Sequence, residues 1–409
     1  MPHIADFRTH LHHRHGCATQ SVHRRLNGVT TIMASKKVLG LTAATAALVL
    51  GLTACGNGDD GGNGGDSAGE EFTFGIVYPQ TGALAFLGPP QISSAKYAIS
   101  EINGAGGILG TEVPEIVEGD EAADGAQANE AANSLVNSDV NAVIGAAASG
   151  MTQAIYDTIT GAEIVQCSGS NTAPDLSDID DGGYFFRTAP SDLMSGPVMA
   201  REIVANNQTS VAIVARADDY GNGYLEAVQD ELEALGAEVA LTETYDPDAT
   251  NFDSVVNAVG NEDPDAVALI SFEEGAQLMA ELLESGVEGD QLCLTDGLNS
   301  PELDVLRFAP QIFDCVTVIA LAAESAGSTG TTDFVEHIAE VSRPEGTERT
   351  TFTECRDLLH QDEAIDYQGT SGDIDFDDNG DPTTATFELF HFGDDGYEIV
   401  GYQEYAYDD

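Results

Sequence analysis

From residue 72 onwards, short apolar segments that suit β-strands alternate with segments whose apolar residues recur at helical spacing. The strand-like segments are 72–78, 113–118, 140–145, 163–167, 211–215, 239–245, 266–272 and 291–295. The helix-like segments are 91–102, 124–136, 151–160, 225–235, 252–259 and 275–285. Such alternation predicts parallel sheets covered by helices. Because a break near residues 187–192 divides the pattern, we expect an α/β fold with two doubly wound parallel-sheet lobes joined by a hinge.

Small polar residues follow two of the predicted strands, at the points where they end. Ser149 and Gly150 follow the strand at 140–145, and Ser170, Asn171 and Thr172 follow the strand at 163–167. The carboxyl ends of neighbouring parallel strands meet at one edge of a sheet, where hydroxyls and backbone N–H groups face a ligand. These residues therefore predict one wall of a ligand pocket without a catalytic group. Ordinary turn and helix-cap chemistry is the alternative explanation.

The composition of the chain makes some classes of partner unfavourable. The 409 residues are 42% hydrophobic, which is enough for two domains with their own cores. The formal net charge is −56, so nucleic acid and anionic membrane surfaces are poor partners.

The N-terminal region predicts export. Residues 1–32 carry six of the nine histidines and indicate a leader that is not native or is processed away, with a metal-binding tract as the alternative. Met33 begins a segment typical of a secretory signal, with two lysines, the apolar run 38–51, and Leu-Thr-Ala-Cys ending at Cys55, which resembles a bacterial lipobox. We expect a signal peptide at 33–54, lipidation at Cys55, and a flexible Gly/Asp-rich tether at 55–71.

Several motifs between residues 72 and 405 occur together in a characteristic order. They are GIVYPQTG (75–82), EINGAGGILG (101–110), FRTAP (186–190), DYG (219–221), DAV (265–267) and FDDNG (376–380). Together they resemble the leucine/isoleucine/valine-binding protein family, the type I periplasmic solute-binding proteins of branched-chain amino acid ABC transporters. The resemblance implies a first lobe made of 72–190 with about 300–365, and a second made of 191–299 with about 366–409.

The resemblance also implies roles for the predicted pocket wall. The hydroxyls of Ser149 and Thr172 would hold a ligand carboxylate, joined by backbone N–H groups around Gly150, Ser170 and Asn171. Several short charge-assisted hydrogen bonds can replace the water around a carboxylate without an arginine.

The opposite wall and the apolar contact follow from the same resemblance. Tyr220 matches an aromatic residue that closes over the ligand, and Phe272 falls where a second aromatic is expected. Asp296 falls where a carboxylate meets the ligand ammonium group, and Leu87 would pack against the ligand side chain. Tyr220, Phe272 and Asp296 could instead be ordinary core or turn residues.

These observations predict a monomeric, lipid-anchored extracytoplasmic receptor that is not an enzyme and needs no cofactor or metal. It would capture a small amino acid or related carboxylate or amide by hinge closure and deliver it to an ABC transporter permease. A ligand-sensing ectodomain of the same fold that feeds a signalling partner is the alternative. A secreted enzyme is a more distant one, with Asp296 and Tyr220 as the only pair to nominate.

Three features leave details open. Only 18 residues separate Gly297 from the apolar segment 316–323, fewer than the family usually has there, so one lip of the cleft is in doubt. Four cysteines of the predicted ectodomain allow two disulfides in three connectivities; they are Cys167, Cys293, Cys315 and Cys355. Residues 375–380 match the first half of a calcium loop, but Thr386 stands where a glutamate is required, which predicts a tight surface turn.

Overall fold

The computed structural model describes residues 17–21, 71–298, 307–393 and 396–407. These described residues belong to one compact unit. The predicted signal peptide at 33–54, the lipidation residue Cys55, and the tether up to residue 70 lie outside the described residues, as does most of the predicted leader at 1–32.

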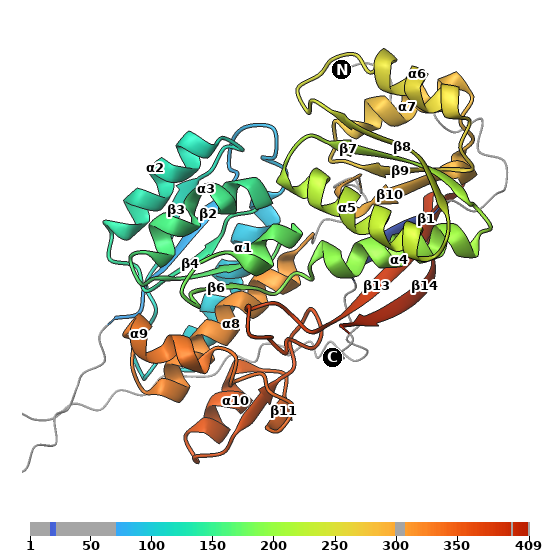
Figure 1. Ribbon diagram of the computed structural model, residues 1–409. Coiled ribbons are helices and arrows are strands. Elements are labelled where there is room, and N and C mark those ends of the chain that lie inside the picture. Colours follow the sequence, from blue (N-terminus) through green and yellow to red (C-terminus); the bar gives the residue numbers. More distant parts are fainter. Residues whose placement is uncertain (1–16, 22–70, 299–306, 394–395, 408–409) are drawn as a thin grey trace, which may run out of the picture. The chain divides into compact units, whose positions relative to one another are not determined.

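The first lobe is built on a five-stranded parallel sheet with the order β3-β2-β4-β5-β6 (Figure 1). Its strands are β2 (Phe74–Tyr78), β3 (Val117–Asp120), β4 (Ala142–Gly145), β5 (Val165–Ser168) and β6 (Phe185–Arg187). β2, β4 and β5 are buried along their whole length, as expected of strands covered on both faces. The strands predicted at 72–78, 140–145 and 163–167 are confirmed, whereas the segment predicted at 113–118 becomes a strand only from Val117 and β6 was not predicted.

Helices cover both faces of this sheet. One face packs on α1 (Gly88–Gly104) and α8 (Ala309–Ala326), and the other on α2 (Gly125–Val136) and α3 (Ser149–Thr160). α8 is the one helix of the described chain that is long and apolar enough to cross a membrane, but 72% of it is buried in the lobe. It is therefore a core helix of the lobe, and its few buried polar residues, such as Asp314, have hydrogen-bond partners.

The second lobe contains a seven-stranded sheet with the order β14-β13-β1-β10-β9-β7-β8. β7 (Ser210–Arg216), β8 (Glu238–Tyr245), β9 (Ala266–Ile270) and β10 (Leu292–Thr295) are parallel, as predicted. Helices α4 (Asp192–Ala205) and α5 (Asp219–Ala234) pack on one face, and α6 (Asp253–Glu262) and α7 (Gly275–Ser285) on the other. The break predicted near residues 187–192 is the connection from β6 to α4.

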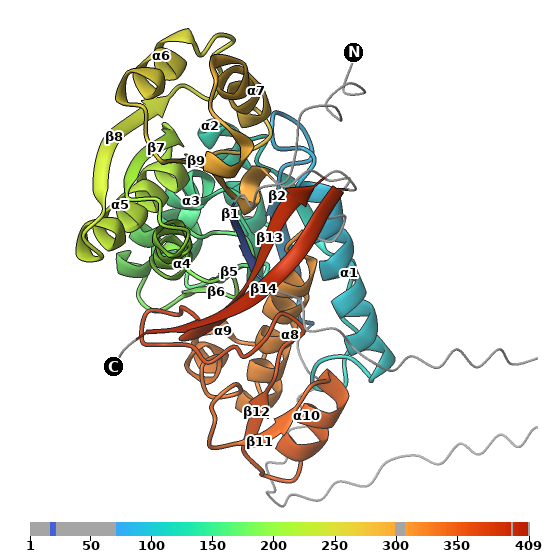
Figure 2. The ribbon, with the colours of Figure 1, turned by 90° about the vertical axis from the view of Figure 1, so that its right-hand side faces the viewer.

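The other half of this sheet is mixed, which the parallel prediction did not include. β13 (Thr384–Gly393) and β14 (Gly396–Ala406) form an antiparallel hairpin (Figure 2). β1 (Cys17–Ser21), from the segment predicted as a leader, runs parallel to β10 and antiparallel to β13. Most of the short segment between Gly297 and α8, residues 299–306, lies outside the described residues.

The remaining elements extend the core of the first lobe. They are α9 (Thr331–Phe334), β11 (Thr347–Arg349), α10 (Phe352–Leu359) and β12 (Ile365–Tyr367). Cys167 of β5 and Cys315 of α8 form a disulfide, whereas Cys293 and Cys355 are buried free thiols. Of the connectivities that the sequence left open, the described ectodomain therefore holds one bridge, and it ties the first sheet to its central helix.

A buried ion pair joins the end of the first sheet to the segment that leads into β13. Arg187 donates to both carboxylate oxygens of Asp381, through Nε at 2.5 Å and Nη2 at 2.7 Å, and through Nη1 to the Ala173 carbonyl at 2.9 Å. The segment predicted as a turn is one, because Asp377 accepts from the backbone N–H groups of Asn379 and Asp381. The end of β6 and the segment before β13 are thus fixed to each other.

Candidate functional site

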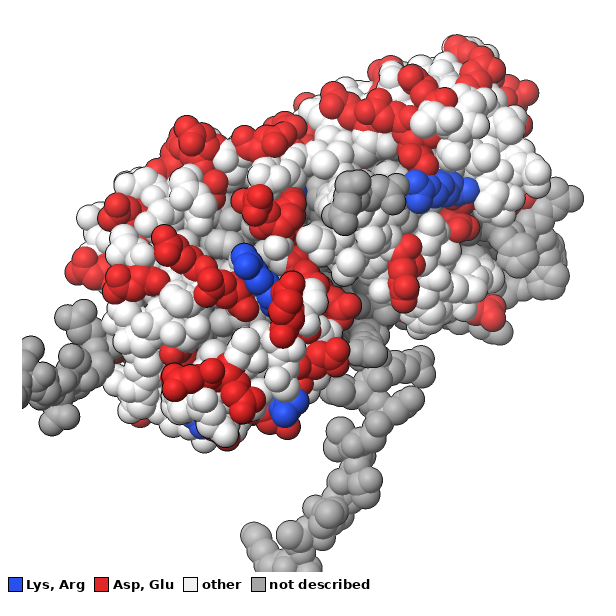
Figure 3. Space-filling view, turned by 60° about the horizontal axis from the view of Figure 1, so that its bottom comes forward, with Lys and Arg blue, Asp and Glu red and all other residues white. Residues whose placement is uncertain are grey.

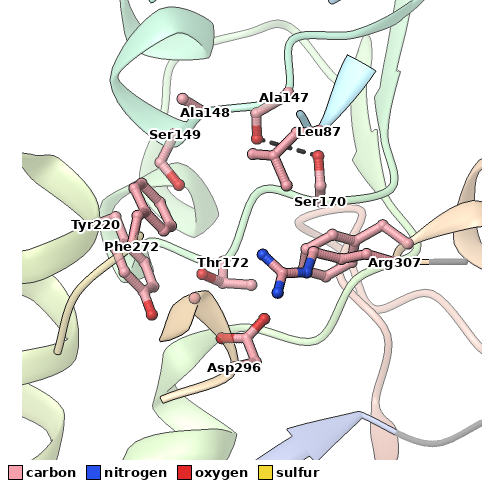
Figure 4. A pocket seen from close by; sticks show the side chains of 12 residues that line it. Leu87, Ala147, Ala148, Ser149, Ser170, Thr172, Tyr220, Phe272, Asp296 and Arg307 are labelled. Carbon is pink, nitrogen blue, oxygen red and sulfur yellow. Dashed lines mark hydrogen bonds between the residues drawn. The ribbon is translucent and has the colours of Figure 1, made fainter. Parts of the chain in front are cut away.

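A cavity lies where the carboxyl ends of β4 and β5 face the carboxyl ends of β9 and β10 (Figure 4). Its lining comes from both lobes and from the start of α8. The lining residues are Leu87, Ala147, Ala148, Ser149, Ser170, Thr172, Tyr220, Phe272, Asp296, Gly297, Arg307 and Phe308.

The first wall of the cavity contains the N-terminus of α3. Ser149 is the first residue of this helix, is 4% exposed, and accepts a hydrogen bond from the Ala173 N–H at 3.3 Å. The first N–H groups of a helix have no acceptor within the helix, and the helix dipole favours an anion there. Together with the Thr172 hydroxyl, this wall can hold a carboxylate, as the sequence predicts.

The prediction for Asn171 concerned its backbone N–H, which donates to the Ser168 hydroxyl at 3.2 Å, and its side chain supports the wall from behind. It is fully buried, donates from Nδ2 to the Ala147 carbonyl at 2.9 Å, and accepts from the Thr152 hydroxyl at 2.5 Å. Ser170 does line the cavity, and its hydroxyl donates to the same Ala147 carbonyl at 3.0 Å. These bonds fix the loop that carries Ala147 and Ala148, which line the cavity.

Gly150 does not line the cavity either, but its lack of a side chain has a clear reason. A Cβ atom at this position would lie 2.9 Å from Oδ2 of Asp219, near the start of α5 in the second lobe. Gly150 therefore allows the two lobes to approach each other closely beside the cavity.

A buried acid that the sequence analysis missed lies under this wall. Glu121, just after β3, accepts from the Ala147 N–H at 2.9 Å and from the Ala148 N–H at 3.4 Å. Burial raises the pKa of Glu121 to about 8, although these two donors oppose the rise. Near neutral pH the wall thus rests on a carboxyl group that keeps its proton.

The second wall is a stack of side chains. The rings of Tyr220 and Phe272 are parallel within 5°, with centroids 4.9 Å apart. The Arg216 guanidinium lies 4.1 Å from the centroid of the Phe272 ring. Arg216 is itself held by ion pairs of 2.6 Å to Asp218 and to Glu274. Both aromatic residues predicted for the site therefore lie at the cavity, and the Arg216 guanidinium holds the Phe272 ring in position.

The second lobe also contributes two acidic side chains to this region. Asp296 follows β10 at the start of a 3₁₀ turn (Asp296–Leu298) and lines the cavity, as predicted. Asp192, which the sequence analysis missed, is 2% exposed and accepts from the Ser195 hydroxyl at 2.8 Å. Burial raises the pKa of Asp192 well above its ordinary value, hydrogen bonds from Ser195 and Thr172 oppose the rise, and the charge of Asp296 adds to it. Asp296, which lines the cavity together with Tyr220, therefore offers its carboxylate to a cationic group of a ligand.

Two further residues complete the cavity. Leu87 is 5% exposed at the start of α1 and gives it an apolar surface, as predicted. Arg307 was not predicted; it is 4% exposed, and its guanidinium points into the cavity (Figure 4). Its rarity was the available signal, because the sequence contains 14 basic residues against 70 acidic ones. In residues 71–298, 307–393 and 396–407, no cluster of three or more His, Cys, Asp or Glu side chains could hold a metal ion.

The chain is similar to proteins of a known family. The family described as "Periplasmic binding protein" matches residues 71–353. The leucine-specific-binding protein of Salmonella typhimurium is 26% identical over 341 residues, which cover 80% of this chain and 92% of that protein. The Leu/Ile/Val-binding protein BraC3 of Rhizobium johnstonii is 28% identical over 234 residues, which cover 57% of this chain and 63% of that protein.

The fold is shared with solved structures. The substrate-binding protein of a branched-chain amino acid transporter from Streptococcus pneumoniae, determined in complex with isoleucine, superposes with a TM-score of 0.67 at 20% identity. The match covers 82% of this chain and all of that one. The predicted fold class of two α/β lobes is confirmed, and the chain belongs to the periplasmic binding protein family.

Proposed function

We propose that this protein is the extracytoplasmic solute receptor of an ABC importer and that it captures a small amino acid or a related carboxylate or amide. The observation that carries the proposal is the cavity with two chemically different walls. One wall offers hydroxyls and a helix N-terminus to a carboxylate, and the other offers Asp296 and aromatic rings to an ammonium group. The similarity to relatives that include a leucine-specific-binding protein supports import over the alternative of a sensor ectodomain.

Hinge closure is the mechanism that suits this arrangement. Because Ser149 and Thr172 belong to one lobe and Tyr220, Phe272 and Asp296 to the other, a ligand that touches both walls binds the closed state more tightly than the open state. It then shifts the population toward closure. The permease recognises the surface of the closed, ligand-bound form. No bond in the ligand is broken in this mechanism, so the protein acts as a binding protein and not as an enzyme.

The proposal includes a lipid anchor at Cys55 and a monomeric receptor. The lipobox-like sequence before Cys55 supports the anchor. Acidic side chains are spread over the face seen in Figure 3, with few basic ones among them, and such a surface is repelled by anionic lipid headgroups. A covalent lipid, not surface charge, would therefore hold the protein at the membrane.

A thermal-shift screen of the full chain against amino acids, amides and small organic acids tests the proposal. A ligand that binds the native state raises the melting temperature by mass action. We expect a stereospecific shift, with the L-amino acid more effective than its D-enantiomer. No shift across the whole panel would contradict the proposed function.

A further inference from the structure

Arg307 is an exception among the buried basic residues. Arg187 and Arg216 are also buried, and both form ion pairs with acids of this chain. The terminal nitrogens Nη1 and Nη2 of Arg307 are buried without a hydrogen-bond partner among the described residues. This arginine faces the candidate ligand cavity.

An unsatisfied guanidinium is expensive to bury, so its position requires an explanation. Removing a charge from water costs several kcal/mol (order of magnitude) unless a partner compensates. This chain has five acidic residues for every basic one, so acids are available in excess as ion-pair partners for an arginine. Instead, the guanidinium lies 5.6 Å from the centroid of the half-buried Phe86 ring, which orients it without satisfying its N–H donors. Within the part of the chain that the structure describes, its planar donor face is therefore left to a group that enters the cavity.

The other polar groups of the cavity already match the two charged groups of an amino acid. The N-terminus of α3 with Ser149 and Thr172 suits the α-carboxylate, and Asp296 suits the ammonium group. An aliphatic amino acid has no further charge, so its binding would seal Arg307 in the closed cleft unpaired. A second carboxylate on the ligand would instead accept two parallel hydrogen bonds from the guanidinium.

We infer that Arg307 binds a second carboxylate of the ligand and that the preferred ligand is an acidic amino acid. The inference rests on the proposed function and specifies its substrate class. Arg307 determines specificity, because every amino acid has the α-carboxylate and the ammonium group that the other cavity residues bind.

Titration calorimetry with the full chain tests this, using L-glutamate, its uncharged isostere L-glutamine, and L-leucine. We expect glutamate to bind at least about 10-fold more tightly than glutamine or leucine, since a hydrogen bond to a charged group gives a discrimination of this order. In Arg307→Gln, glutamate affinity should fall by about 10–100-fold, while glutamine affinity changes by less than about 3-fold. Arg343→Gln is the matched control, because Arg343 is exposed and its loss changes the net charge equally.

The ligand-free melting temperature of Arg307→Gln gives a second readout. Because the substitution removes an unpaired buried charge, we expect the melting temperature to stay the same or rise. A large fall would show that the guanidinium already has a structural partner, which would overturn the inference.

The possible failures can be told apart. Tighter binding of leucine than of glutamate would leave the proposed function standing and overturn the acidic ligand. An equal loss for all ligands in Arg307→Gln would assign Arg307 to the shared α-carboxylate, which also overturns it. No binding of any amino acid by the native chain would contradict the proposed function itself.

Discussion

The two walls of the cavity are built by different means. The first-lobe wall consists of backbone groups and short hydroxyls. Asn171 and Ser170 hold it in place by donating to the Ala147 carbonyl, and Glu121 does so by accepting from the N–H groups at 147–148. The second-lobe wall consists of long side chains, with Tyr220 stacked on Phe272 above the Asp296 carboxylate. The first wall can therefore share the binding of a carboxylate among many donors, whereas the second depends on a few side chains.

The largest effect expected from this difference is in the second wall, at Asp296. Replacing Asp296 by alanine leaves the ligand ammonium without its carboxylate, and we expect amino acid binding to weaken by about 3–5 kcal/mol if the pair is buried. Calorimetry with the amino acid that gives the largest thermal shift measures this. Glu262→Ala, at an exposed acid, is the matched control. An equal loss for an analogue without the amino group would remove Asp296 from this role.

The next effect concerns the support of the first wall, at Glu121. The pKa of Glu121 is about 8 in the folded protein against an ordinary value of 4.5, so the folded state keeps a proton that the unfolded state loses. This stabilisation is complete below about pH 4.5 and is lost as the pH rises through about 8. We expect the unfolding free energy of the native chain to fall over this range by on the order of 3 kcal/mol relative to Glu121→Gln.

Urea unfolding at several pH values measures this difference. The glutamine variant retains an acceptor for the Ala147 N–H, so it serves as its own control for the general self-repulsion of an acidic chain. Parallel pH profiles for the two proteins would mean that Glu121 is ionised in the folded state and that the wall rests on a charge.

The contrast between the walls also explains what the sequence could predict. The alternation of strands and helices is a local pattern, so it placed Ser149 and Thr172 at adjacent strand ends and the structure agrees. It could not show that Asn171, one residue before Thr172, points away from the cavity. The direction of a side chain at a strand end depends on its local bonds, here to Ala147 and Thr152.

Long-range contacts account for most of what was missed. Glu121 is buried by a loop 26 residues further along the chain, and β1 pairs with strands more than 270 residues away. Arg307 lies after a short segment without a periodic pattern, so no local signal indicated that it faces the cavity. In the second wall, Tyr220, Phe272 and Asp296 were placed by resemblance to a family, because nothing in their spacing shows that they meet.

A smaller effect is expected where a wall residue acts from behind. Asn171→Ala removes the bonds to the Ala147 carbonyl and the Thr152 hydroxyl and leaves these groups buried, which should lower the unfolding free energy by about 1–3 kcal/mol. Urea unfolding measures it, with Asn137→Ala as the control, since Asn137 is exposed and bonds only locally, to the Asn133 carbonyl. A variant with native stability would show that the loop is held by its other bonds.

The smallest effect is expected for a residue that we place in direct contact with the ligand. Ser149→Ala removes one hydroxyl, but the backbone N–H groups at the start of α3 and the Thr172 hydroxyl remain, so amino acid affinity should fall by only about 1–2 kcal/mol. Calorimetry measures this, with Ser138→Ala at the exposed end of α2 as the control. If the loss equalled that of Asp296→Ala, the first wall would depend on a single hydroxyl. The two walls would then share one design, in which a single side chain on each side holds one charged end of the ligand.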